Sequence, residues 1–523
     1  MRSLAPIILL TLLGGLPASA EAYELEFDLG LYNRFSAKVN EVERLLRYDL
    51  ARAAWDTSGY LNPSRNDLSY GLVASAGVYF APTKWLGLGL DVDSGLLKPY
   101  GRLPATQALT LQRLGSVFGS PEVVTTGDAH PATANERRIR DEARATAFVR
   151  QAYVRLLAPK TGWLKVDLGR RRTELADGLI YDDFATGVRL VADFDLLRGL
   201  PLRLSAQAVL PNHDFTVGLR SPLVEAKVEW VISMMESLGL LFAYYRDGDD
   251  NFSHFFSPLV GEAAVRTAGR LEPAVHGELF AVASTLGGSS RANLFWVGAA
   301  GNKLIGDLTL SGTFLVQLGT VRVDNPFAPL ASLPVRWPAL LPRAERLEIA
   351  TLGFALDTSA RYLLRENLTL SGFFLYLSGE ENPFTQGERT SGRYGSFISV
   401  VPYLTHTNLF FSGGLNETFS GRQASSSGLN GRGVIAPGAG LDWEITERVA
   451  VGTTLAGLFA QEVSPTGGRV YGLEVDLEAR WEIASWVKAS VEYDVLVPGS
   501  FFAQRGVAHK VLVGLDVSYE YER

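Results

Sequence analysis

Apolar and polar residues alternate along most of this chain. Residues 473–482 give the longest example, in which five apolar positions alternate with Glu474, Asp476, Glu478, Arg480 and Glu482. A second run follows at 487–495, where Lys488 and Glu492 lie among the polar positions. Successive side chains of a β-strand point to opposite faces, so a period of two predicts strands with one apolar and one polar face.

The length and number of these runs predict a membrane protein. Runs of about ten residues match a tilted crossing of the bilayer, and they recur to the last residues of the chain. Aromatic residues gather near the ends of runs, as at interfacial girdles: Tyr79, Phe80, Trp85, Trp481 and Trp486. Because lipid leaves no backbone polar group unpaired, we expect a closed all-β transmembrane antiparallel β-barrel of about 18 strands, within a range of about 16 to 22. The alternative is a large exported β-rich domain.

The first twenty residues predict export. Arg2 precedes an apolar stretch, and Ala18, Ser19 and Ala20 are the small residues that a signal peptidase recognises. We therefore expect a signal peptide at 1–20, a single barrel domain at 21–523, and a location in the outer membrane of a Gram-negative bacterium, in contact with outer-membrane lipid.

Composition excludes several classes of function. The 523 residues include no Cys, which removes disulfide scaffolds and thiolate chemistry, and a net charge of −7 argues against nucleic acid as a partner. The six His are scattered without metal-ligand spacing, and no G-x-S-x-G motif is present. We predict no catalytic residue, no metal and no cofactor, and hence not an enzyme.

The connections between strands are of two kinds. Short ones, such as 158–162 and 483–485, are typical of periplasmic turns, and long ones, such as 99–142 and 380–394, are typical of external loops. Residues 395–419 fit either two further strands or a plug inside the barrel. Sixteen or more strands leave an aqueous channel, so the lumen needs a lining.

The polar positions of the strands should supply that lining, because charges are costly against lipid. The predicted pore-lining residues are Gln151, Tyr153, Arg155, Lys165, Asp167, Arg171, Arg189, Asp193, Arg203, Glu474, Asp476, Glu478, Arg480, Lys488 and Glu492. Arg150 and Arg170 have the opposite parity, which predicts a rim, bulge or strand end. The basic cluster around Arg155, Arg171 and Arg189 is compatible with a filter for anions or with cross-strand ion pairs that brace the wall.

Several short segments resemble the alginate-export family of outer-membrane barrels. They are Arg150-Gln151-Ala152-Tyr153-Val154-Arg155, Gly169-Arg170-Arg171, the stretch 177–183, and Pro498-Gly499-Ser500-Phe501-Phe502. The resemblance implies an 18-stranded barrel that exports a polysaccharide together with a periplasmic polysaccharide-export protein.

Polysaccharide export is therefore the expected function. A general or substrate-specific uptake porin is the alternative, because it shares every barrel feature of the sequence. A barrel that serves as an adhesin or anchor, and a barrel enzyme, are further alternatives.

Overall fold

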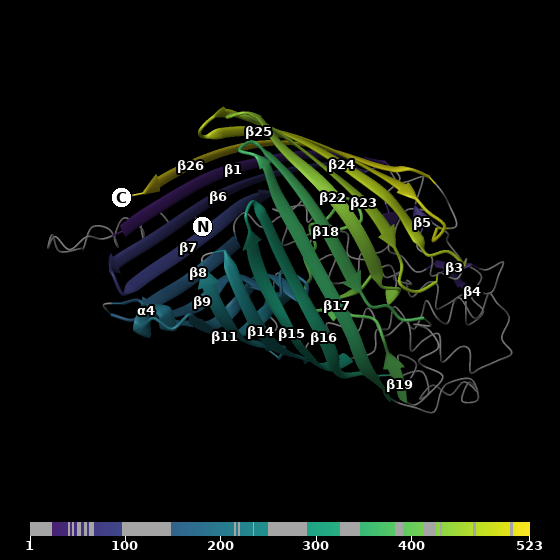
Figure 1. Cartoon of the computed structure of the whole chain (residues 1–523), viewed down its shortest axis with the longest axis horizontal. Helices are drawn as coiled ribbons and strands as arrows, with labels where there is room; N and C mark the ends of the chain where they lie inside the picture. Colours follow the sequence, from purple (N-terminus) through teal and green to yellow (C-terminus); the bar gives the residue numbers. More distant parts are fainter. Residues whose placement is uncertain are drawn as a thin grey trace, which may run out of the picture.

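A closed β-barrel dominates the computed structural model of the chain (Figure 1). The structure describes residues 24–39, 42–43, 47–49, 54–56, 60–61, 67–96, 148–159, 161–213, 216–217, 220–233, 235–248, 290–324, 346–381, 391–411, 425–428, 431–463, 467–502 and 506–522. The predicted signal peptide at 1–20 lies outside these residues. Among them, no helix is long and apolar enough to cross a bilayer.

Eighteen antiparallel strands form the ring, as the sequence predicted. They are β1 (Glu24–Val39), β6 (Asp67–Thr83), β7 (Leu86–Leu96), β8 (Phe148–Leu157), β9 (Leu164–Leu175), β10 (Tyr181–Asp193), β11 (Leu202–His213), β13 (Leu223–Ser233), β14 (Glu236–Asp247), β15 (Ser290–Ile305), β16 (Leu308–Asp324), β17 (Arg346–Arg365), β18 (Leu368–Leu377), β22 (Val434–Thr446), β23 (Val449–Phe459), β24 (Val470–Ala484), β25 (Val487–Pro498) and β26 (Ala508–Glu522). Each pairs with its neighbours in the chain order, and β1 pairs with β26 to close the ring.

Short elements extend the rim. β12 (Thr216–Val217) pairs with the end of β11, and β19 (Ser391–Tyr394) pairs in parallel with β17 beyond the end of β18. Separate two-stranded pairs are formed by β2 (Val42–Glu43) with β5 (Tyr60–Leu61), β3 (Arg47–Asp49) with β4 (Ala54–Asp56), and β20 (Ile398–Ser399) with β21 (Ser425–Ser426).

The two ends of the barrel differ. Figure 1 shows the C terminus and helix α4 (Phe194–Arg198) at one end, and β3, β4, β5 and β19 at the other. The short turns, such as 306–307 and 447–448, lie at the end that carries the termini. By the habit of outer-membrane barrels, this end is periplasmic and the end with the long connections is extracellular.

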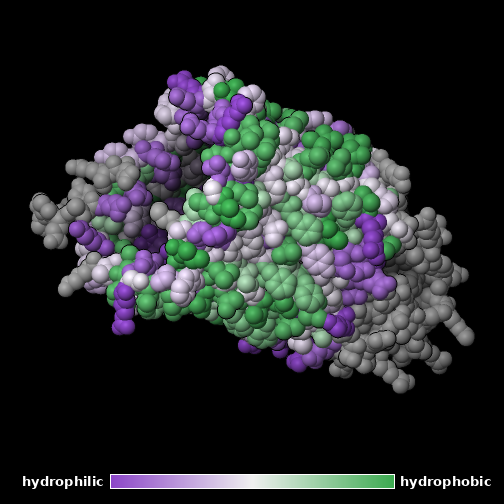
Figure 2. Space-filling model, in the orientation of Figure 1, coloured by the Kyte–Doolittle hydropathy of each residue, from purple (hydrophilic) through white to green (hydrophobic). Residues whose placement is uncertain are grey.

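The outer surface of the ring is apolar. Exposed large hydrophobic residues occupy every second position of the strands, for example Leu238, Leu240 and Phe242 on β14. Figure 2 shows hydrophobic residues gathered over the strands of the face in view, with hydrophilic residues toward the two ends. A belt of this kind matches the hydrocarbon layer, so the polar parity of each strand faces the lumen.

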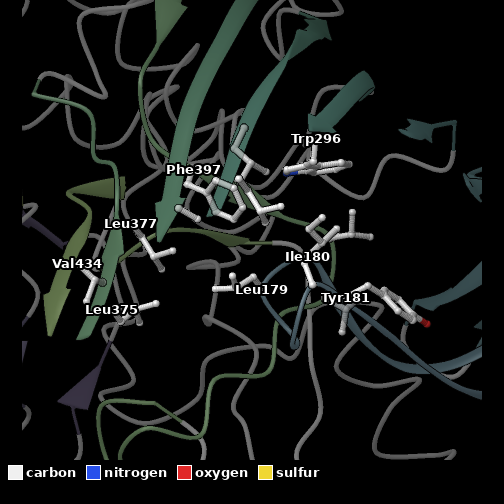
Figure 3. Close-up of a cluster of buried hydrophobic side chains, with 14 of the residues drawn as sticks. Leu179, Ile180, Tyr181, Trp296, Leu375, Leu377, Phe397 and Val434 are labelled. Atoms are coloured by element: carbon white, nitrogen blue, oxygen red, sulfur yellow. The ribbon is translucent and has the colours of Figure 1, made fainter. Parts of the chain in front are cut away.

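The lumen contains a packed apolar core. Leu179 and Ile180, directly before β10, and Tyr181, its first residue, lie beside Trp296 of β15 and Phe397, as Figure 3 shows. Leu375, Leu377 and Val434 extend the same buried cluster. Part of the barrel interior is therefore filled by protein.

Candidate solute pathway

Residues 395–411 form an internal segment that enters the lumen between the wall strands. The chain leaves β19 at Tyr394, and Phe397 N donates to Ser378 O at 3.0 Å. Gly353 makes this entry possible, because a Cβ there would lie 2.8 Å from Phe397 Cα. Ile398 N then donates to the buried Gln317 Oε1 at 2.7 Å. Of the two interpretations of 395–419, the described part is an internal plug and not a pair of wall strands.

One end of the internal segment is bound to the turn between β9 and β10. Val400 N donates to Ile180 O at 2.9 Å, and Tyr403 N donates to Gly178 O at 3.0 Å. In return, the Asp182 N–H donates to Val401 O at 2.9 Å. These backbone hydrogen bonds join the β9–β10 turn to residues 400–403 of the internal segment.

The β9–β10 turn has an unusual backbone. Ala176 and Asp177 have φ values of 52° and 53°, and Gly178 follows with 78°. Left-handed conformations are rare for residues with a Cβ, and they persist only where the surroundings hold them. Thr313 on β16 supplies part of that support, because its hydroxyl donates to the Asp177 carboxylate from another part of the wall.

The other end of the internal segment reaches a different part of the wall. His406 stacks on Phe373 with ring centroids 4.5 Å apart, and its Nε2 lies 3.0 Å from Asp357 Oδ2. Residues 407–410 then bind side chains of β24, β25 and β26. The segment thus crosses the lumen and narrows it.

Three basic side chains of β8 and β9, on the parity predicted to face the lumen, surround a single carboxylate. Arg155 Nε is 2.9 Å from Asp167 Oδ1, Lys165 Nζ is 4.0 Å from Asp167 Oδ2, and Arg171 also binds Asp167. Asp167 is buried, whereas the three cations keep 20%, 36% and 27% of their side-chain surface exposed. Three positive charges therefore share one negative charge.

Arg189 adds a fourth cation to this wall. It lies directly opposite Asp167 in the β9–β10 register. Its guanidinium donates to Thr173 Oγ1 and to the carbonyl oxygens of Arg171 and Ala185, at 3.0 Å for each carbonyl. Within the described part of the chain, no carboxylate is within salt-bridge distance of it. We call Arg155, Lys165, Arg171 and Arg189 the basic wall.

Aromatic rings also face this part of the lumen. The guanidinium of Arg171 lies 4.7 Å from the Tyr153 ring centroid, and that of Arg155 lies 5.5 Å from the same ring. Gln151 binds Asp91 across the β7–β8 pair. The β7–β8 register shifts directly after this pair, and Arg150 is the residue without a partner in the register. The shift explains why the parity of Arg150 is irregular in the sequence.

The other predicted lining residues are more evenly paired. Arg203 Nη2 is 3.0 Å from Asp193 Oδ2, near the periplasmic end, and Asp193 also caps helix α4. Arg480 Nε is 2.7 Å from Glu478 Oε1, and Arg480 is largely exposed. Lys488 is exposed near the turn between β24 and β25.

Glu474, Asp476 and Glu492 have a different environment. They have the predicted lumen-facing parity, but they are 0%, 5% and 0% exposed. The internal segment binds Glu474 and Asp476, and Lys510 binds Glu492. Sequence reasoning missed several residues that contact this segment, among them Gln317, Asp357 and Lys510. Gln317 is a lone polar residue within the apolar run 314–318, and Lys510 directly precedes the apolar run 511–513.

The comparisons with known proteins point away from the predicted family. No family model and no curated protein matches the chain. Among solved structures, the chain is similar to the outer-membrane protein OpdK of Pseudomonas aeruginosa, with 10% identity over 95% of this chain and 99% of that one and a TM-score of 0.46. OccK9 (OpdG) of the same organism gives 11% identity, 95% and 98% coverage and a TM-score of 0.48. OccAB1 of Acinetobacter baumannii is 8% identical over 95% of this chain and 96% of that one, with a TM-score of 0.47.

Two expectations from the sequence are therefore corrected. The similar solved structures reported above are outer-membrane and Occ proteins by name and not alginate-export barrels, so the predicted family was wrong. Polysaccharide export with a periplasmic export protein was expected from that resemblance and is set aside with it. The closed ring of 18 antiparallel strands with an apolar outer belt is that of a β-barrel of the Gram-negative outer membrane.

Proposed function

We propose that this barrel is a substrate-specific porin for small anionic solutes. The observation that carries the proposal is the charge balance of the basic wall. Among the described residues, Arg155, Lys165 and Arg171 have only Asp167 within salt-bridge distance, and Arg189 binds uncharged oxygens. A carboxylate that passes this wall can replace water at guanidinium groups that are still partly exposed. Guanidinium recognises carboxylate with paired hydrogen bonds, which favours anions with that group.

The internal segment supplies the second requirement, a limit on size. A lumen of 18 strands without a plug leaves a wide aqueous channel. Here a buried apolar core and residues 395–411 occupy part of that space and bring the pathway to the wall. Weak contacts at several sites along a narrow path allow selection without trapping the solute.

Conduction through single channels tests this proposal. The full chain is reconstituted in planar bilayers, and the reversal potential is measured in a KCl gradient, before and after addition of vanillate, the small carboxylate with which OpdK has been solved. We expect preference for chloride over potassium and transient current block by vanillate, but not by the uncharged alcohol of the same ring. Preference for potassium, or equal block by both compounds, would contradict the proposal.

A further inference from the structure

Four carboxylates and one lysine are buried together where the internal segment meets the wall. Glu474 and Asp476 come from β24, Glu492 and Asp494 from β25, and Lys510 from β26. All five are at most 5% exposed. Lys510 Nζ lies 2.7 Å from Asp494 Oδ2 and also binds Glu492. We call these five residues the acidic mount.

Glu474 accepts three hydrogen bonds from the internal segment. Its carboxylate accepts from Thr407 Oγ1 at 2.9 Å and from Phe410 N at 3.0 Å, and Leu409 N donates to its other oxygen at 2.5 Å. A carboxylate that accepts two backbone N–H groups and a hydroxyl satisfies donors that water cannot reach at this depth. Glu474 therefore binds the segment much as a capping residue binds a helix end.

Asn408 is held from three strands at once. Its N–H donates to Asp476 Oδ2 at 3.2 Å, and its side-chain Nδ2 donates to Asp494 Oδ1 at 3.1 Å. Its carbonyl oxygen accepts from Lys510 Nζ at 3.2 Å. Three polar groups of Asn408 thus bind residues of three different strands, which fixes both the position and the orientation of Asn408.

Glu478 provides the contrast within the same strand. It lies on the same face of β24, four residues beyond Glu474, but its side chain is partly exposed and its carboxylate binds Arg480 with both oxygens at 2.7 Å. No bond between Glu478 and the internal segment appears in the described part of the chain. The two glutamates thus share a parity but differ in what they bind.

We propose that Glu474, Asp476, Asp494 and Lys510 are positioning residues that hold residues 407–410 across the lumen and so set the width of the solute pathway. Their charged groups bind the segment and one another, so these four residues take no part in the selection of ions. This inference rests on the proposed function only in that the barrel conducts; it does not depend on which sign of charge the pathway prefers.

A pair of matched variants tests the inference. Glu474→Gln keeps the size of the side chain but replaces one acceptor oxygen by an amide nitrogen, so at least one of the three buried donors loses its partner. The loss of one such bond shifts the equilibrium between the bound and the released internal segment by about tenfold toward the released state. We expect higher single-channel conductance and frequent sublevels. Glu478→Gln removes the same charge from the same strand but no bond to the internal segment, and should add no sublevels.

A second variant lies in the segment itself, where it leaves the wall strands intact. Asn408→Asp places a carboxylate against Asp494 and removes the donating amide, and it should also raise conductance. If Glu474→Gln does not insert, Asn408→Asp decides the question. Wild-type conductance without added sublevels in the variants that insert would overturn the inference. Potassium preference in the wild type would instead refute the proposed anion selectivity and leave this comparison valid.

Discussion

Asp167→Asn separates the two interpretations of the basic wall most directly. Asp167 is the shared counter-ion of Arg155, Lys165 and Arg171, so its neutralisation leaves the wall one unit more positive without adding a side chain. If these cations attract the solute, the loss of Asp167 should raise the preference for anions. If they only brace the barrel, the loss should weaken the wall and leave selectivity as it was.

The size of the effect follows from Coulomb's law. A unit charge removed at about 6 Å from a passing anion changes its energy by about 0.7 kcal/mol in a water-like dielectric. Screening by 0.1 M salt, with a Debye length of about 10 Å, reduces this by roughly half. The ratio of chloride to potassium permeability should therefore rise by about two- to threefold.

Reversal potentials in a KCl gradient measure this ratio for a single channel. Arg171→Gln should lower the ratio by a similar factor, and the Asp167→Asn, Arg171→Gln double variant should return close to the wild type. A ratio that falls or stays constant in Asp167→Asn, in barrels that still insert, would refute the role of the basic wall in selection.

Two further predictions concern packing and burial. Gly353→Leu brings side-chain atoms into the place of Phe397, so the internal segment should be displaced, and protease cleavage within the lumen-facing residues 395–411 should appear where the wild type resists. Lys510→Met leaves the buried Asp494 without its cation and should destabilise the folded barrel by about 3–5 kcal/mol in denaturant titrations from lipid vesicles. Lys488→Met, at an exposed position of the neighbouring strand, should cost less than about 0.5 kcal/mol.

Local periodicity predicted the wall but not what covers it. The alternation at 473–482 correctly assigns Leu473 and Leu477 to lipid, because the period of a strand fixes its two faces. The same pattern gives Glu474 and Glu478 one parity, although the first is buried under the internal segment and the second is partly exposed. That difference arises from residues 407–410, more than sixty positions away, and no local pattern records it.

The family resemblance failed for a related reason. Motifs such as Gly-Arg at a strand position or Pro-Gly in a loop follow from the turns and ends that any antiparallel barrel requires. Such motifs indicate a β-barrel but carry no information about the molecule that it transports. The sequence did contain the basic residues of β8 to β10, but their imbalance became visible only when the register placed Arg155, Lys165 and Arg171 around Asp167.

The attachments of the internal segment also constrain the order in which the molecule assembles. Its bonds reach back 220 positions, from Ser399 to Leu179, and forward 102 positions, from Asn408 to Lys510. Contacts between residues so distant in the chain form late, because the intervening chain must first be ordered. Lys510 belongs to β26, the last strand of the chain, so this end of the segment cannot be fully seated before β26 has paired with β25. We expect a newly inserted barrel to be wider, and leakier, than the mature one until that last step is complete.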